Sequence, residues 1–239
     1  MQIINAIWEK RNMGVDTIEI RFDKTDILDN IQADFEGIVA QYVVAKVPSE
    51  KNEIVEYVQN RDFRYIEDLI TVEHDLHEVN RDSLHQRLYD ATGYRKMTEE
   101  DIEFMQMEIR MGMFSTDRIS QDKAFSADIS AIRYFNWTDD LLKQGATPYV
   151  VLYKGEPAGF IILQTKDGIS YVSVLGGGYR KFRKSGLGII QKEQEIVKKL
   201  GGKRVETTVS SNNVSQLKAL IINGYIPKSV EHVFVKHDF

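Results

Sequence analysis

The sequence predicts an α/β protein of the α+β type, with a mixed, mostly antiparallel central sheet. Three observations support this prediction. Residues 16–76 alternate strand-like and helical segments. Residues 98–175 contain two helical segments and then three strand-like runs, which the turns KGEP and KDG separate. Residues 183–237 contain a glycine-containing turn, an amphipathic helix, a strand, a short helix and a last strand, an order in which helices and strands share a core.

Three segments in the first part of the chain are rich in β-branched and aromatic residues, which favour strands. The intervening segment NEIVEYVQNRDF (52–63) instead predicts a helix, because it places Ile54, Val55 and Val58 on one face. The three predicted strands are DTIEIRF (16–22), GIVAQYVVAKVP (37–48) and YIEDLITVEHDL (65–76).

A polar segment follows these elements. Residues 80–96, NRDSLHQRLYDATGYRK, lack a sustained hydrophobic period, which is typical of a linker. The length of 239 residues suits one large domain or two modest ones. We therefore expect two domains, one over residues 1–90 and one over residues 91–239.

The second domain is predicted to begin with a capped helix. Thr98 followed by Asp101 indicates a capping box that opens a helix along Ile102, Met105 and Ile109. The later turns predict an antiparallel meander of three strands. These strands lie within residues 148–175, and the other expected elements are a loop over 114–125, helices over 126–145, 186–202 and 212–225, and strands over 204–209 and 231–237.

Composition and charge argue against several classes of function. The net charge of −5 argues against a nucleic-acid binder, and no apolar run approaches the roughly 20 residues that cross a bilayer. The first residues lack the features of a signal peptide, so we expect a cytoplasmic protein without nucleic-acid or membrane partners. The absence of cysteine excludes disulfides and a cysteine-linked acyl intermediate. His74 and His77 would face opposite sides of a strand, so we expect no metal.

The stretch RKSGLG (183–188) lies between a predicted strand and a predicted helix. Backbone amides at a helix start lack intrahelical acceptors and carry partial positive charge. Gly186 and Gly188 let a phosphate approach that backbone closely, and Arg183 and Lys184 add full charge. The stretch is therefore suited to a pyrophosphate. The nucleotide P-loop pattern is absent, and the dinucleotide fingerprint is incomplete.

Arg183, Gly186 and Gly188 fit the acyl-CoA loop pattern of the GCN5-related N-acetyltransferases (GNATs), which is Arg or Gln, two residues, Gly, any residue, then Gly or Ala. The order of elements over residues 98–239 also resembles that family. The whole chain is similar to the bacterial TDP-fucosamine acetyltransferases, which join a truncated, cofactor-free half-domain to a complete transferase domain. The stretches that carry this second resemblance are WEKRNMGVDTIEI, VVAKVP, RDF, FSTDRISQDKAF and RYFNW.

The resemblance implies a GNAT fold whose sheet splays between the parallel strands SYVSVL (170–175) and RVETTV (204–209). It also implies an enzyme that uses acetyl-CoA as co-substrate and transfers the acetyl group directly to an amine. The pantetheine arm would pair with the exposed edge of the first strand, and the pyrophosphate would bind the loop. The implied acyl-CoA contacts are Val174, Leu175, Gly176, Arg183, Lys184, Ser185, Gly186, Leu187, Gly188, Asn213 and Leu220.

The chain departs from the family pattern at the usual catalytic acid. Many members place a tyrosine seven residues after the position of Asn213, where this chain has Leu220. The departing thiolate would then receive its proton directly from the attacking ammonium, or from Tyr225, or from a water held by Ser211 or Asn213. Asn213 and Tyr225 are therefore the catalytic candidates.

A second departure is the stretch GGGYRKF (176–182). It stands where the family often has a valine and a proline. We expect the preceding strand to end at Leu175 and the glycines to form a turn or a short insertion.

In this family the acceptor site lies around the loop that joins the first two helices of the transferase domain. Phe114, Arg118 and Phe125 are therefore candidates to stack on, or pair with, a nucleotide sugar. The alternative is that both phenylalanines are core residues and that Arg118 is a surface or salt-bridged cation. The resemblance favours a nucleotide-linked 4-amino-4,6-dideoxyhexose as the acceptor.

Two other functions stay open on the sequence. The acceptor could be another small amine, a peptide or a polyamine, and acidic groups in the acceptor cleft would favour the polyamine. The chain could also be a catalytically degenerate acyl-CoA-binding module, because Leu220 replaces the usual acid. The first domain could pair two chains into a homodimer or shape the acceptor side.

Overall fold

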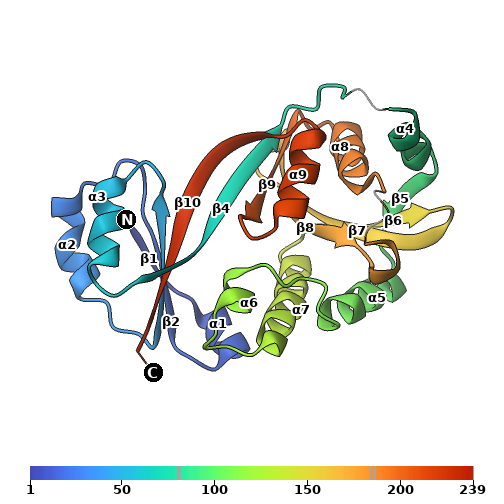
Figure 1. Cartoon of the computed structure of the whole chain (residues 1–239). Helices are drawn as coiled ribbons and strands as arrows, with labels where there is room; N and C mark the ends of the chain where they lie inside the picture. The colour runs from blue at the N-terminus through green and yellow to red at the C-terminus, as the bar shows by residue number, and fades with distance from the viewer. Residues whose placement is uncertain (80–81, 184, 186, 239) are drawn as a thin grey trace.

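The computed structural model describes residues 1–79, 82–183, 185 and 187–238. Its strands form one mixed sheet (Figure 1). From one edge to the other, the order is β1 (Gln2–Asn5), β2 (Thr17–Arg21), β3 (Tyr42–Pro48), β10 (Ile226–His237), β4 (Arg64–His74), β9 (Arg204–Ser210), β8 (Ser170–Gly178), β7 (Glu156–Thr165), β6 (Thr147–Tyr153) and β5 (Thr92–Lys96).

Helices cover both faces of this sheet. None of the described helices is both long and apolar enough to span a membrane. The helices are α1 (Ile7–Met13), α2 (Leu28–Glu36), α3 (Asn52–Gln59), α4 (Ser83–Asp90), α5 (Glu99–Arg110), α6 (Arg118–Gln121), α7 (Ala127–Lys143), α8 (Ile189–Lys199) and α9 (Val214–Ile222), with a 3-10 turn at Arg180–Phe182.

The sheet is mostly antiparallel, as predicted. Among the described strands, the parallel neighbours are β2 with β3 and β8 with β9. The meander β6-β7-β8 is antiparallel throughout. The capping box at Thr98 and Asp101 opens α5 as the sequence predicts.

Alternate residues of β7 divide the core of the second half into two layers. Phe160 and Ile162 face α5 and α7, whereas Ile161 and Leu163 face α8. This two-residue period is the geometry of a strand buried on both faces. Figure 1 shows the same arrangement, with α8 and α9 on one side of the sheet and α5 and α7 on the other.

The last strand joins the two halves of the chain. β10 pairs along one edge with β3 and along the other with β4, and β4 in turn pairs with β9. It begins at Ile226, five residues before the predicted start at 231. The sheet therefore runs without a break from β1 to β5.

The predicted linker over residues 80–96 is wrong. Its described part forms α4 and β5. Asp82 caps α4 by accepting hydrogen bonds from the backbone amides of Leu84 and His85. No described α4 residue is buried, and the helix is polar on average, so its cap is a clearer signal than its apolar residues. The sequence predictions did not include β1, α1 or α2, and α6 lies within a predicted loop.

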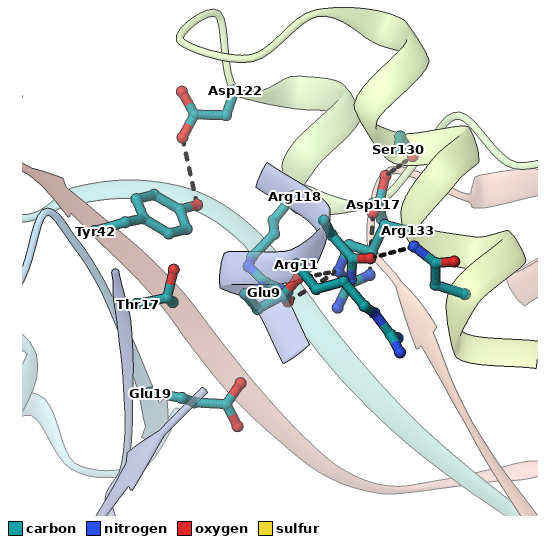
Figure 2. A network of polar contacts seen from close by, with 12 residues as sticks. Glu9, Arg11, Thr17, Glu19, Tyr42, Asp117, Arg118, Asp122, Ser130 and Arg133 are labelled. Carbon is teal, nitrogen blue, oxygen red and sulfur yellow. Dashed lines mark hydrogen bonds and ion pairs between the residues drawn. The ribbon is translucent and has the colours of Figure 1, made fainter. Parts of the chain in front are cut away.

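A buried ion network fixes α1 against α6 and α7 (Figure 2). Glu9 of α1 accepts hydrogen bonds from Arg118 at 2.5 Å and from Arg133 at 2.9 Å. The Glu9 and Arg118 side chains are 1% and 7% exposed. Burial alone would raise the pKa of Glu9, but the charges of Arg118 and Arg133 outweigh it and lower that pKa to about 2.

We expect Glu9→Ala to lower the free energy of unfolding by roughly 3–5 kcal/mol, because it leaves Arg118 buried without its partner. Arg11→Ala is the matched control on the same helix. Arg11 pairs with Asp140 at 2.6 Å but is 46% exposed, so its loss costs less than about 1 kcal/mol. Denaturant unfolding measures both values, and equal losses would contradict the prediction.

The Glu9 pair also sets a pH dependence of stability. Because the pKa of Glu9 is lower in the folded chain, its stabilisation is present above about pH 4.5 and is lost as the pH falls toward 2. Glu9→Ala is therefore expected to flatten the acid side of the stability curve. A curve of unchanged shape would contradict this assignment.

Candidate functional site

The parallel strands β8 and β9 separate partway along their length. Their ladder pairs Ser170 with Arg204 and ends, among the described residues, at Val172 with Glu206. One residue further, the Thr207 hydroxyl donates to the Ser173 carbonyl at 2.8 Å. β8 continues to residue 178 and β9 to residue 210, so the sheet opens between them as the resemblance implies.

A cavity of about 550 Å³ lies in this opening. Its walls come from β8, β9, α8, α9 and the segment before α6. The predicted site residues that line it are Phe114, Val174, Leu175, Gly176, Arg183, Leu187, Asn213 and Leu220.

Other predicted site residues lie elsewhere. Lys184 and Gly186 lie outside the described residues. The described residues that were predicted for the site but do not line the cavity are Arg118, Phe125, Ser185, Gly188 and Tyr225.

The α8 helix opens beside this cavity. Its N-cap is Gly188, which offers no side-chain cap, and no acidic residue occupies its first turn. The backbone amide of Ile189 donates to the Leu187 carbonyl at 2.8 Å. The amides that follow in the first turn of a helix lack intrahelical acceptors and can bind an external one, and the helix dipole favours an anion. The helix begins at Ile189, three residues after the predicted start.

The guanidinium of Arg183 places a positive charge in the cavity near the start of α8. Its side chain lines the cavity and donates to the backbone carbonyl of Met113. The other charged side chain among the described lining residues is Glu193. An anion could therefore meet both a guanidinium and helix amides here.

The prediction that β8 ends at Leu175 is wrong, because the glycines continue the strand. Gly176, Gly177 and Gly178 pair with Ile161, Phe160 and Gly159 of β7. A β-carbon on Gly159 would lie 2.5 Å from the Gly177 carbonyl oxygen, so only glycine allows β7 and β8 to approach this closely.

The register of β8 against β7 shifts by one residue just before these glycines. Leu175 pairs with Ile162 and Ser173 with Leu163, so Val174 is the extra residue of a bulge. A bulge turns the strand and re-aims its backbone groups. This bulge lies in the part of β8 that faces the cavity.

A buried carboxyl group lines the inner wall of the cavity. Glu193, on the second turn of α8, is 6% exposed. One of its oxygens accepts from the Ser173 hydroxyl and the other from the Tyr225 hydroxyl. Burial raises the pKa of Glu193, against the opposing effect of these two hydrogen bonds. Tyr225 therefore lies behind Glu193, away from the cavity.

Glu193 is not among the site residues predicted from the sequence. A signal was present, because positions 190, 193 and 197 share one helical face and the first and last are apolar. A carboxyl group on the apolar face of an amphipathic helix is expensive to bury and is a functional candidate.

The candidate acceptor residues divide between the cavity and the core. Phe114 lines the cavity and packs on Tyr134, with ring centroids 4.6 Å apart. Phe125 packs edge-on against Tyr42 at 5.2 Å. Arg118 is buried in the Glu9 network. Of the three, Phe114 is the residue that a molecule in the cavity can reach.

The histidine pair differs from the sequence expectation. The rings of His74 and His77 stack at 4.5 Å instead of facing opposite sides, and with Asp75 they place three ligand atoms within 4.8 Å of one another. A zinc ion lies about 2.0–2.1 Å from each imidazole nitrogen. The expectation that the chain holds no metal stays a prediction.

Solved structures of GCN5-related N-acetyltransferases share this architecture. The one from Sphaerobacter thermophilus aligns with a TM-score of 0.63 and 13% identity, over 99% of this chain and 75% of that chain. The chain has the GNAT fold. The GNAT structure from Kribbella flavida gives a TM-score of 0.53 and 13% identity, over 94% of this chain and 82% of that one. At these identities the likeness is one of fold.

A third structure with the GNAT fold is a fungal glucosamine N-acetyltransferase region within a multi-domain β-N-acetylglucosaminidase. It gives a TM-score of 0.59 and 12% identity, over 87% of this chain and 27% of that chain. No protein-family model matches the chain, and its sequence matches no curated protein. The predicted fold class is confirmed by these structures.

The close approach of β7 and β8 predicts that a larger residue at Gly159 destabilises the folded protein. Gly159→Ala places a methyl group against the Gly177 backbone and should cost about 1–3 kcal/mol of the free energy of unfolding. Gly178→Ala is the control, because its new β-carbon would meet its nearest atoms at 3.6 Å, which is ordinary contact. Denaturant unfolding measures the difference, and equal tolerance at both positions would refute the packing argument.

Proposed function

We propose that the protein is an acetyl-CoA-dependent N-acetyltransferase that transfers the acetyl group directly to the amine of a small acceptor. The observation that carries this proposal is the opening between β8 and β9, which leads to the uncapped start of α8. An extended thioester arm fits an open strand edge, and a diphosphate fits a helix start. The GNAT fold supports the same assignment.

The chain offers contacts for the pantetheine arm and for the diphosphate of acetyl-CoA. In our proposal the pantetheine arm pairs with β8 along Val174, Leu175 and Gly176, beyond the last β9 pair. The diphosphate binds at the start of α8 beside Arg183. The loop residues that complete this site in the proposal are Lys184, Ser185, Gly186, Leu187 and Gly188.

The reaction needs no covalent enzyme intermediate, and the chain has no cysteine to form one. The acceptor nitrogen releases a proton to solvent and forms a bond to the thioester carbon. The carbon–sulfur bond breaks, and the sulfur leaves with its electron pair and takes up a proton. The protein's part is to hold the two reactants in contact and to supply that proton.

The cavity lining favours a hydroxylated acceptor. Phe114 and Tyr134 supply aromatic surface, which suits the faces of sugar and base rings. The acidic group among the described lining residues is Glu193, whose buried position leaves a polyamine without surface counter-charges. Hydroxyl and amide groups that could bind a sugar come from Thr116, Thr208, Ser210, Asn213, Ser215 and Gln216.

The acceptor that we propose is an amino sugar, specifically a nucleotide-linked 4-amino-4,6-dideoxyhexose. The resemblance to TDP-fucosamine acetyltransferases supports it. Three of the stretches that carry this resemblance supply Glu9, Arg118 and Arg133, which form one buried network. The fungal structure with this fold is, by its name, a glucosamine N-acetyltransferase, so the fold accommodates an amino sugar.

Thiol release from acetyl-CoA tests the proposed function. We expect release that depends on the added amine, with nucleotide-linked amino sugars well above spermidine and a lysine-containing peptide. A preference for spermidine or for the peptide would reassign the acceptor. Measurable acetyl-CoA binding without release for any amine would show an acyl-CoA-binding module instead.

Arg183→Ala tests the cofactor site. The loss of one charge-assisted contact of about 1.5–3 kcal/mol should weaken acetyl-CoA binding roughly 10- to 100-fold in isothermal titration calorimetry. Arg180→Ala is the matched control, because Arg180 carries the same charge three residues earlier and does not line the cavity. Unchanged affinity in Arg183→Ala would contradict the placement of the diphosphate.

A further inference from the structure

Glu193 is a carboxyl group without a charged partner in the wall of the cavity. Its two oxygens accept from the hydroxyl groups of Ser173 and Tyr225. No cation among the described residues forms an ion pair with it. The neighbouring Lys192 pairs with Glu195 instead, at 2.9 Å. A buried carboxylate that lacks a cation is costly, so the group keeps its proton more readily than a surface glutamate.

The groups that face Glu193 do not offset the free-energy cost of burying its charged form. Tyr225 is the titratable group in direct contact, and its own pKa is raised well above the usual range by burial and by the Glu193 charge. Arg183 is the other charged side chain that lines the cavity. Burial is the largest influence on Glu193 and raises its pKa. Burial therefore favours the protonated form of this carboxyl group.

The opposite helix of the cavity offers no acid. Leu220 of α9 stands where many relatives carry the tyrosine that protonates the thiolate, and its apolar side chain lines the same cavity. Asn213, the N-cap of α9, accepts from the backbone amide of Gln216, and a neutral amide is not a proton donor for a thiolate. Among the described lining residues, Glu193 is therefore the acid of lowest intrinsic pKa that faces the opening.

We propose that Glu193 is the catalytic acid that protonates the departing CoA thiolate, with Ser173 and Tyr225 as positioning residues. This inference rests on the proposed function. As the carbon–sulfur bond breaks, the carboxyl proton passes to the sulfur and leaves a Glu193 carboxylate. The hydroxyl groups of Ser173 and Tyr225 then stabilise that carboxylate by donating to its two oxygens. Glu193 regains a proton from solvent after the thiol departs.

The arrangement also explains why Tyr225 is not the acid itself. Tyr225 is 1% exposed, and its hydroxyl group is directed at Glu193. It lies outside the cavity lining, so any proton that it held would have to pass through Glu193. The Glu193 carboxyl group is thus the donor that can reach a molecule in the cavity.

Glu193→Gln tests the proposal most directly. Glutamine keeps the size of the side chain and an oxygen that accepts from Ser173 or Tyr225, so the fold and the cavity are preserved. We expect the single-turnover rate of acetyl transfer to fall at least 100-fold, in line with general acid catalysis. Acetyl-CoA affinity should stay within about threefold of the wild type.

Glu195→Gln is the matched control. It removes a carboxyl group from the same helix, but Glu195 pairs with Lys192 and Lys199 and does not line the cavity. Its transfer rate should stay within about threefold of the wild type. A rate for Glu193→Gln within threefold of the wild type would overturn the proposal and would favour direct proton transfer from the attacking ammonium.

The pH profile separates a catalytic from a structural role. An acid must be protonated to act, so the wild-type transfer rate should fall as the pH rises through the pKa of Glu193, and Glu193→Gln should lack this alkaline limb. Tyr225→Phe removes a hydrogen bond that favours the carboxylate, so it should raise the pKa of Glu193 and move the limb to higher pH. Loss of transfer in Tyr225→Phe at every pH, with transfer retained in Glu193→Gln, would assign the acid to Tyr225 instead.

A measurement without turnover distinguishes this proposal from the proposed function. In the free protein labelled with 13C at glutamate carboxyl carbons, the signal lost in Glu193→Gln belongs to Glu193. We expect it at the shift of a carboxylic acid at pH 7, and the shift of a carboxylate would overturn the proposal. Absence of thiol release by the wild type with every amine would instead overturn the proposed function, and the catalytic role of Glu193 with it.

Discussion

The site depends on one constraint, the point at which the β8–β9 ladder stops. Among the described residues, the pairing of the two strands ends at Val172 with Glu206, and a side-chain bond from the Thr207 hydroxyl to the Ser173 carbonyl lies at the start of the opening. Polar backbone left unpaired within a sheet needs a partner. In the proposed function, a co-substrate arm that pairs like a strand supplies that partner, and its diphosphate binds at the start of α8.

The second half of the chain is connected to the first by two different kinds of contact. β10 pairs with both β3 and β4, and Glu9 of α1 binds Arg118 and Arg133 beside the wall that Phe114 and Tyr134 form. Through Arg133, the first helix therefore contacts α7 next to the cavity wall that we propose as the acceptor side. The division into a truncated domain over residues 1–90 and a catalytic domain over residues 91–239 stays a prediction.

Short sequence motifs predicted the structural elements that form through interactions between neighbouring residues. The capping box of α5, the meander and the glycine-containing loop before α8 are each readable within a few residues. The helix α4 was missed because it is polar on average and its clearest signal is the Asp82 cap. Glu193 was missed as a site residue because its partners, Ser173 and Tyr225, are 20 and 32 residues away. Arg118 was a candidate for the acceptor, with a salt-bridged cation as the alternative, and the structure shows the alternative because Arg118 pairs with Glu9, 109 residues earlier.

A crystal structure of the complex with acetyl-CoA tests the central claim most directly. The account predicts that the pantetheine amides bond to the open edge of β8 between Val174 and Gly176, with the diphosphate at the start of α8. A co-substrate bound elsewhere, or strands β8 and β9 joined by a continuous ladder in that crystal, would contradict it.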